Sequence, residues 1–254
     1  MLTVTPALPV VIALLALGGA AVARSLGHAR AVLTAGLRAT LQLAAVSLII
    51  AAVLKALPWT VAFLLAMYAV AGLTAGRRVS RRRPWAAAIP IAAGTLPVLA
   101  LLTLTGVAPA QGVVLIPITG ILLGGCLTAT AQAGRRAMDE LQTRHGEVEA
   151  ALALGFPDRD ARMEVCRDRA AQALLPALDQ TRTVGLVTLP GAFVGMLLGG
   201  AEPVQAGIVQ LVVLVSLLAA EAVAVLVTIE LVCRGRFGRT GNPASWSPDA
   251  ASPG

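Results

Sequence analysis

The stretch QAGIVQLVVLVSLLAAEAVAVLVTIELV, residues 205–232, decides the fold class of this chain. A helix needs about 20 predominantly apolar residues to cross the hydrocarbon core of a bilayer. This stretch exceeds that length and carries one acidic residue, Glu221, well inside it. The stretch therefore predicts a transmembrane helix, and the similar runs elsewhere in the chain predict an all-α, polytopic helical bundle.

The composition of the whole chain also indicates a membrane protein. Its 254 residues are 57% hydrophobic, 13% charged and 3% aromatic, with a mean hydropathy of +0.82. A soluble domain carries about 25% charged residues, and a soluble fold of this size would leave much apolar surface in water. The three cysteines, Cys126, Cys166 and Cys233, show no CxxC spacing, so neither a zinc site nor a disulfide framework is indicated.

Seven apolar windows approach the length of a membrane span. They are residues 6–23, 36–54, 58–76, 86–107, 112–131, 183–200 and 205–232. Six spans, with residues 6–23 lying elsewhere, are the alternative. Residues 1–9 carry no Lys or Arg, so the positive start of a signal peptide is missing and a retained first helix is expected. The transmembrane domain is predicted to cover residues 1–239, followed by a disordered tail at 240–254 that is rich in Pro, Ser, Gly and Ala.

The positive charges predict the orientation. If the N-terminus is outside, the cytoplasmic segments are residues 24–35, 77–85, 132–182 and 233–254. Together with Arg38, at the cytoplasmic end of the second helix, they hold 19 of the 20 Lys and Arg residues, and only Lys55 is outside. The positive-inside rule therefore predicts an outside N-terminus and a cytoplasmic C-terminus in the plasma membrane. The net charge of +7 then reflects these cytoplasmic segments, and no nucleic-acid partner is expected.

The segment 132–182 is the one sizeable polar stretch between predicted spans. Its apolar residues recur at helical spacing, so two or more short helices are expected. About fifty residues are too few for a catalytic domain but enough for a docking platform. Within it, Glu149-Ala150-Ala151 is followed by three residues and Gly155. This EAAxxxG pattern predicts a short helix ended by a glycine at positive φ, and it resembles the loop with which ATP-binding-cassette (ABC) permeases dock their ATPase.

Longer runs resemble one family of such permeases. The run from Thr183 through Gly185 and Pro190 to Gly191, preceded by Ala173–Asp179, is similar to the signature of the FetB (YbbM) family. These are permease subunits of iron-export ABC transporters, and plant relatives are linked to aluminium tolerance. Three shorter elements also resemble the family: Arg38-x-x-x-Gln42, Ile116-Pro117-Ile118-x-Gly120 and Glu202-Pro-Val-Gln-Ala206. One departure is Gly124-Gly125, where the resemblance implies Gly-Asn.

The resemblance implies a permease that exports iron or another metal ion with ATP hydrolysed by a separate subunit. The chain itself lacks a Walker A loop, which needs a lysine, because its one lysine is Lys55 in an outer corner. ATP and Mg²⁺ are therefore expected in an ABC ATPase subunit, with no cofactor in this chain, which is itself not an enzyme. The resemblance further implies a permease homodimer. No cluster of His, Cys, Asp and Glu has metal-site spacing, so the metal ligands are not identified.

Charged and polar residues in the spans are the first pathway candidates. Arg38 and Gln42 are four residues apart and share one helix face, where they either line a pathway or anchor the interface through a snorkelling arginine. Glu221 is either a cation ligand or proton carrier, or it pairs with a polar group in the bundle or faces a wet cavity. The rival to an ABC permease is accordingly an ATP-independent carrier or channel with Glu221 as its coupling carboxylate. A membrane enzyme is disfavoured, because HExxH, GxSxG and paired-aspartate motifs are missing.

Helix-breaking and small residues supply the remaining candidates. Pro190 predicts a kink in the sixth span, which is either static or part of a gate. The candidate gate covers residues 183–195, includes Thr183, Gly185 and Gly191, and connects directly to the docking loop. Pro117 belongs to the fifth-span motif. Small residues at GxxxG spacing predict close helix contacts, either within the subunit or at a dimer interface. These are Gly120 with Gly124, Gly191 with Gly195, and then Gly199.

Overall fold

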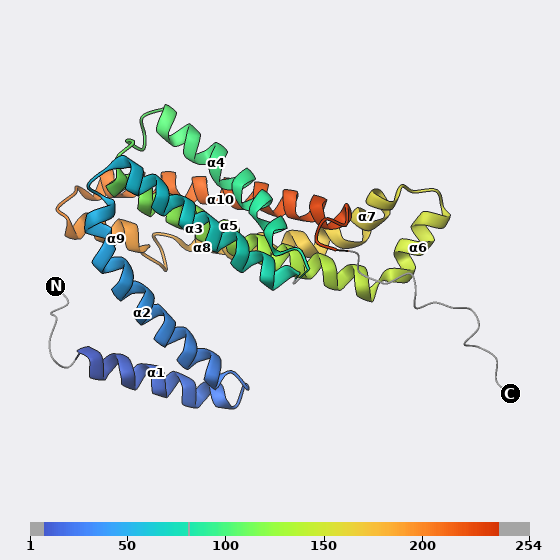
Figure 1. The fold of residues 1–254 in the computed structure, drawn as a ribbon, viewed down its shortest axis with the longest axis horizontal. Coiled ribbons are helices and arrows are strands. Elements are labelled where there is room, and N and C mark those ends of the chain that lie inside the picture. Colours follow the sequence, from blue (N-terminus) through green and yellow to red (C-terminus); the bar gives the residue numbers. More distant parts are fainter. Residues whose placement is uncertain (1–7, 81, 239–254) are drawn as a thin grey trace. The chain divides into compact units, whose positions relative to one another are not determined.

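The computed structural model describes residues 8–80 and 82–238 (Figure 1). Within them the regular elements are helical, apart from one isolated β-bridge between Val184 and Thr188, which confirms the predicted all-α class. The predicted tail at 240–254 lies outside the described residues. Five of the described helices are long and apolar enough to cross a membrane. They are Ala29–Val53, Leu57–Val79, Pro84–Leu104, Gly112–Thr143 and Pro203–Cys233.

The chain divides into two compact units, residues 1–59 and 60–254. In the first unit, α1 (Leu8–Arg24) packs against α2 (Ala29–Val53) through a turn in which Gly27 has a φ of 71°. At 1.5 Å per residue, α1 is about 26 Å long, slightly less than the ~30 Å hydrocarbon core. No residue of α2 is buried, so its apolar side chains are left for lipid or another protein surface.

The second unit is organised around the last helix, which packs on α4, α5, α7 and α9. In Figure 1, α5 and α10 run alongside each other, and α6 and α7 lie at the end where both helices finish. The elements are α3 (Leu57–Val79), η1 (Pro84–Ala87), α4 (Ala88–Leu104), α5 (Gly112–Thr143), α6 (His145–Ala153), α7 (Asp158–Ala171), η2 (Gln172–Leu174), α8 (Leu175–Thr183), α9 (Gly191–Leu198) and α10 (Pro203–Cys233).

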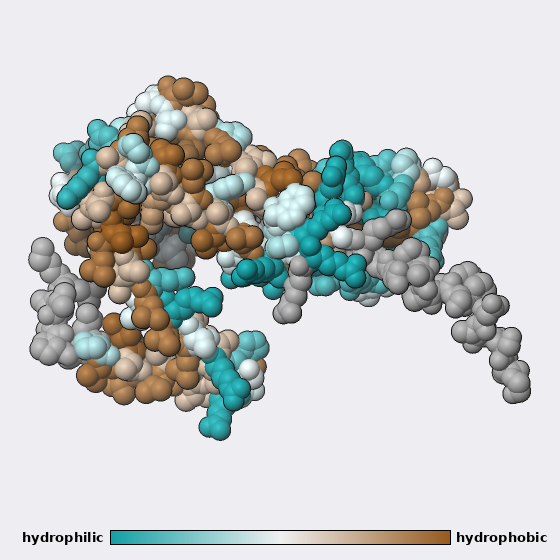
Figure 2. Space-filling model, in the orientation of Figure 1, coloured by the Kyte–Doolittle hydropathy of each residue, from teal (hydrophilic) through white to brown (hydrophobic). Residues whose placement is uncertain are grey.

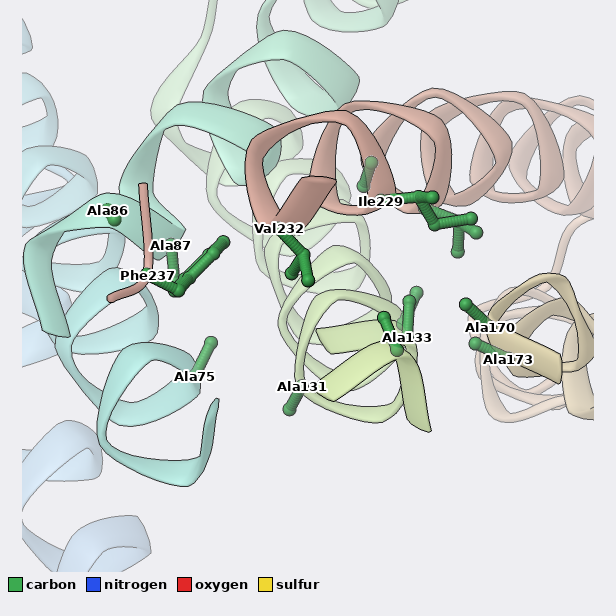
Figure 3. Close-up of a cluster of buried hydrophobic side chains, with 14 of the residues drawn as sticks. Ala75, Ala86, Ala87, Ala131, Ala133, Ala170, Ala173, Ile229, Val232 and Phe237 are labelled. Carbon is green, nitrogen blue, oxygen red and sulfur yellow. The ribbon is translucent and has the colours of Figure 1, made fainter. Parts of the chain in front are cut away.

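Small side chains build the core of the second unit. Figure 3 shows alanines of α3, η1, α5 and α7 grouped around Ile229, Val232 and Phe237. Lipid offers no hydrophobic drive to helix association, so close backbone approach supplies the packing energy. The approach is tightest at two glycines. A Cβ on Gly76 would lie 1.6 Å from the Pro84 carbonyl oxygen, and one on Gly94 would lie 2.3 Å from the Ala220 carbonyl oxygen.

Three of the glycines at GxxxG spacing do not make these contacts, so the within-subunit version of that prediction is wrong for Gly124, Gly191 and Gly195. A Cβ on Gly124, Gly191 or Gly195 would meet nothing within 4 Å, and one on Gly120 would meet only the Met67 side chain. Loop connections decide which helices cross and where, and this information is not contained in a four-residue spacing. The dimer-interface alternative for these open glycines stays a prediction.

The predicted sixth span, residues 183–200, is not a single helix. Helix α8 ends at Thr183, and α9 contains only eight residues. Eight helical residues rise about 12 Å, far less than the ~30 Å hydrocarbon core. The expected kink at Pro190 is therefore wrong, because this residue caps the start of α9 with a ψ of 150°. Proline lacks an N–H and the preceding Val184, Val187 and Thr188 are β-branched, so a helix through this segment is disfavoured.

The surface of the second unit has two chemical zones. Exposed large apolar side chains cover α3, α4, α5 and α10, as Figure 2 shows in brown. The teal, hydrophilic surface gathers over the α7 end of the unit. An apolar belt of this extent is the surface that lipid covers in a membrane protein.

Candidate functional site

Helix α6 contains the predicted docking motif. Glu149, Ala150 and Ala151 lie in its second half, and Gly155 follows with a φ of +92°. The Phe156 N–H donates to the Ala151 carbonyl (3.1 Å), and the Gly155 N–H donates to the Leu152 carbonyl (2.9 Å). This pair of bonds is a Schellman motif, which satisfies carbonyls that the helix end leaves free. The predicted short helix with a positive-φ glycine at its end is confirmed.

One side of α6 is packed and the other is free. Val148 is buried in the core, whereas the Glu149 side chain is exposed. At the capped end, Leu152, Leu154 and Phe156 are 40%, 80% and 47% exposed. Figure 2 shows this apolar patch as a brown tip beyond the hydrophilic surface over α7. Exposed apolar side chains that project from a polar segment are a common feature of protein interaction sites.

Arg144, at the corner between α5 and α6, fixes the docking helix. Its guanidinium forms an ion pair with Glu147, with Nε donating to Oε1 at 2.7 Å, and approaches Glu140 at 3.6 Å. Its Nη1 also donates to the Val165 carbonyl of α7 (3.3 Å). The hydrogen bonds from Arg144 hold the pKa of the Glu147 carboxyl below its usual value, so the pair stays charged at neutral pH. The start of α6 is thus tied to both neighbouring helices.

A second group of charges joins α7 to the end of α10. Arg159 donates to both carboxylate oxygens of Glu230, at 3.2 and 2.6 Å, and Arg234 donates to the same carboxylate at 2.6 Å. Glu230 lies in the last turn of α10, and its side chain is 23% exposed. Between the same two helices, the buried thiols of Cys166 and Cys233 are 3.6 Å apart. The segment 132–182 is therefore a braced helical platform, and its first residues, 132–143, continue α5 rather than opening a separate loop.

The predicted gate residues form a compact turn between α8 and α9. The Thr183 carbonyl accepts from the Val187 N–H (3.0 Å), and the Gly185 N–H donates to the Thr188 carbonyl (2.9 Å). Gly185 has a φ of +82°, which an L side chain rarely adopts. Pro190 and Gly191 then begin α9. The structure brings Thr183, Gly185 and Pro190 together in one short segment, and their role as a gate stays a prediction.

Glu221 lies where three membrane helices meet. It is 8% exposed, and its carboxylate packs on Gly125 of α5, where an added Cβ would be 2.3 Å from Oε1. Cys126 follows Gly125, and its buried thiol faces Gly94 of α4 and lies near both Glu221 and Thr95. No hydrogen bond or ion pair to the Glu221 carboxylate is found within residues 8–80 and 82–238. The alternative in which Glu221 pairs with a polar group is thus not realised in the described part of the chain.

The sequence profile of UPF0014, described as an uncharacterised protein family, matches residues 5–237. The chain belongs to the UPF0014 family. A rice (Oryza sativa subsp. japonica) relative, "UPF0014 membrane protein STAR2", is 35% identical over 198 residues, which cover 76% of this chain and 70% of that protein. The family match and these long apolar helices together show a multi-pass membrane protein.

Two further relatives of this UPF0014 chain bear functional names. "Protein ALUMINUM SENSITIVE 3" of Arabidopsis thaliana is 39% identical over 158 residues, 61% of this chain and 58% of that protein. "Probable iron export permease protein FetB" of Escherichia coli (strain K12) is 32% identical over 151 residues, 58% of this chain and 56% of that protein. The predicted resemblance to the FetB family is thereby confirmed. No solved structure matches the chain.

The structure accounts for the departure of this UPF0014 member at Gly124-Gly125. A side chain at position 125 would meet the Glu221 carboxylate and the Leu217 side chain, at 2.3 and 2.4 Å from its Cβ. The resemblance implies an asparagine at this place. In this chain the polar group comes instead from α10, and a glycine on α5 makes room for it.

The remaining predicted pathway residues lie at other positions of the chain. Arg38 and Gln42 are exposed on α2, one turn apart on the same face, in the first unit of the chain. Pro117 is exposed within α5, which continues through it. Sequence reasoning missed Thr95 and Cys126 as neighbours of Glu221, and no sequence signal could have found them, because helix crossings bring them together. Among the described residues, no group of three or more His, Cys, Asp and Glu side chains is placed to hold a metal ion.

Proposed function

We propose that this chain is the membrane-spanning permease subunit of an ABC transporter of the plasma membrane. It exports a metal ion, with iron the first candidate, and the energy comes from ATP hydrolysed with Mg²⁺ in a separate ATPase subunit. The metal and its direction follow from the name of the Escherichia coli relative, which contains "iron export permease". The aluminium in the name of the Arabidopsis relative keeps other metal ions in consideration.

The observation that carries the proposal is the geometry of α6. Its EAAxxxG sequence forms a capped helix with exposed Leu152, Leu154 and Phe156. This helix lies at the end of a platform in which ion pairs join α7 to α5 and to α10. A short rigid helix with a free apolar side fits the groove of a partner protein. The ion pairs give that partner a mechanical connection to the membrane helices.

A homodimer completes the proposed transporter, because two ATPase subunits act on two permease chains. The open faces at Gly191 and Gly195 support such an assembly, since small residues let helices from two subunits approach closely. In addition, α9 has no buried residue within the single chain.

The docking role is tested by purifying the chain with a candidate ABC ATPase subunit and measuring the affinity of the pair. Leu154→Asp is expected to weaken binding by about 10- to 100-fold, as truncation of a central interface residue does. Gly155→Ala is expected to weaken it by about 5- to 30-fold, because a left-handed alanine costs about 1–2 kcal/mol. An added Cβ at Gly155 has nothing within 4 Å, so this effect is one of conformation and not of a clash.

The matched control is Gly146→Ala, in the first turn of the same helix and equally free of neighbours. It places alanine in a helical conformation and is expected to leave binding unchanged. Equal behaviour of Gly146→Ala and Gly155→Ala, or full binding by Leu154→Asp, would exclude α6 as the docking element.

A second candidate function is an ATP-independent carrier or channel. The buried, unpaired Glu221 carboxylate favours it, because ionisable groups inside a bundle often carry ions or protons. Metal flux into vesicles that contain the chain alone separates the two. Flux without ATPase and ATP supports the carrier, and flux that requires both supports the ABC permease.

A further inference from the structure

Three pairs of neighbouring residues meet at the crossing of α4, α5 and α10. They are Gly94-Thr95, Gly125-Cys126 and Ala220-Glu221. A Cβ on Gly94 would lie 2.3 Å from the Ala220 carbonyl oxygen and 3.0 Å from the Cys126 sulfur. The glycines therefore let the helices approach until the Cys126 thiol lies next to the Thr95 hydroxyl and near the Glu221 carboxylate.

The Thr95 hydroxyl, the Cys126 thiol and the Glu221 carboxylate have few other interaction partners. Thr95 is 2% exposed, and its hydroxyl oxygen makes no hydrogen bond, although it is next to the Cys126 thiol. Cys126 is fully buried, and Glu221 is 8% exposed with no hydrogen-bond or ion-pair partner in the described chain. An unpaired buried hydroxyl costs free energy and an unpaired buried carboxylate costs more. A ligand that binds all three groups would recover that cost.

The chemistry of the donors selects the ligand. A carboxylate oxygen attracts a cation, and a sulfur ligand favours ions of borderline or soft character such as Fe²⁺, Co²⁺ and Zn²⁺. Hard ions such as Mg²⁺ and Al³⁺ prefer oxygen ligands alone. The set of one sulfur, one carboxylate and one hydroxyl therefore fits a divalent transition-metal ion.

We propose that Thr95, Cys126 and Glu221 form a transit site for a divalent transition-metal ion in the membrane part of this chain. The inference rests on the proposed function as a metal permease and adds the ligands and the class of ion. When the ion binds, Cys126 releases its thiol proton to water and the thiolate and carboxylate neutralise the two positive charges.

A site with only two strong ligands suits passage rather than storage. Structural metal sites use four ligands, and no group of three or more metal-binding side chains occurs in the described residues. An ion in transit must bind well enough to leave water and weakly enough to move on. The position on three helices also allows a small shift of α10 to separate Glu221 from Cys126.

The test is Co²⁺ binding to the purified full-length chain in detergent or nanodiscs, read by the thiolate-to-cobalt charge-transfer absorption. The wild type is expected to show the band, and Cys126→Ser to lose it. Glu221→Gln is expected to weaken binding by about 10-fold or more. The Cys166→Ser/Cys233→Ser double variant is expected to keep the band, which excludes the other thiol pair. Fe²⁺ and Zn²⁺ should displace Co²⁺, and Mg²⁺ and Al³⁺ should not.

A matched pair of glycine variants tests the geometry without removing any donor. Gly125→Ala places a Cβ 2.3 Å from the Glu221 carboxylate and is expected to weaken Co²⁺ binding by about 10-fold. Gly124→Ala has nothing within 4 Å and should bind as the wild type does. No cobalt band in the wild type, or a band lost only in the Cys166/Cys233 variant, overturns the proposal. Neither result affects the ATPase-docking experiment, so the site can fail while the permease assignment survives.

Discussion

Replacing Gly76 with alanine is expected to destabilise the second unit strongly. Gly76 lies on α3 where η1 crosses it, and an added Cβ would be 1.6, 2.4 and 2.6 Å from the carbonyl oxygen, carbonyl carbon and Cα of Pro84. Ordinary van der Waals contact begins at 3.4 Å, so the Cβ would lie about 1.8 Å too close to the Pro84 carbonyl oxygen. All three atoms are backbone, so no side-chain rotation relieves the clash and the two elements must separate.

Overpacking costs about 1–3 kcal/mol, and a backbone clash of this size belongs at the upper end. With about 2–4 °C per kcal/mol for a chain of this length, the Tm of Gly76→Ala should fall by about 6–12 °C. Gly124→Ala is the control, because its Cβ has open space and alanine favours the helix. Its Tm should stay level or rise by up to about 4 °C.

The chain offers a built-in reporter for this measurement. All three cysteines are fully buried, so a fluorogenic maleimide reacts only as the protein unfolds. Melting curves of the wild type and both variants in the same detergent give the Tm values directly. If Gly76→Ala melts within about 2 °C of the wild type, which corresponds to a cost below about 1 kcal/mol, the contact between α3 and η1 is not as close as described.

Three further outcomes are expected. Phe237→Ala removes the largest fully buried side chain and should cost about 3–5 kcal/mol, seen in the same melting assay; an unchanged Tm would mean that Phe237 is not packed in the core. Mild oxidation should join Cys166 and Cys233, whose sulfurs are 3.6 Å apart, and lower the titratable thiols of the unfolded chain from three to one. Arg159→Glu should lower the Tm and the additional change Glu230→Arg should restore part of it, whereas additive effects would argue against the ion pair.

The sequence alone was sufficient to predict the helices that are long and apolar enough to span a membrane. The run around Glu221 became one continuous helix, and Gly155 ended the docking helix as its lack of a Cβ allows. These features depend on local chemistry. The prediction of a membrane span at residues 183–200 was wrong because hydropathy does not describe backbone geometry. Gly185 has a left-handed conformation and Pro190 lacks an N–H, and together they form a turn within an apolar run.

The candidate sites followed the same division. Glu149 and Gly155 could be placed from a motif because their helix is local. Cys126 could not be connected to Glu221, since about a hundred residues of chain separate them and only the crossing of α5 and α10 brings them together. The free glycine at 124 and the crowded one at 125 look alike in the sequence, and only the neighbouring helix distinguishes them.

One feature of α10 joins the platform to the membrane interior. Glu230, held by Arg159 of α7, and Glu221, at the donor cluster, lie on the same helix, nine residues or about 14 Å apart. The residues between them include no glycine and no proline, so this part of α10 is a stiff rod. A movement of α7 that keeps the Arg159–Glu230 ion pair would therefore also move the part of α10 that carries the Glu221 carboxylate. Helix α10 therefore links an ion pair at its C-terminal end, between Glu230 and Arg159, to the acidic side chain of Glu221 further inside the helix.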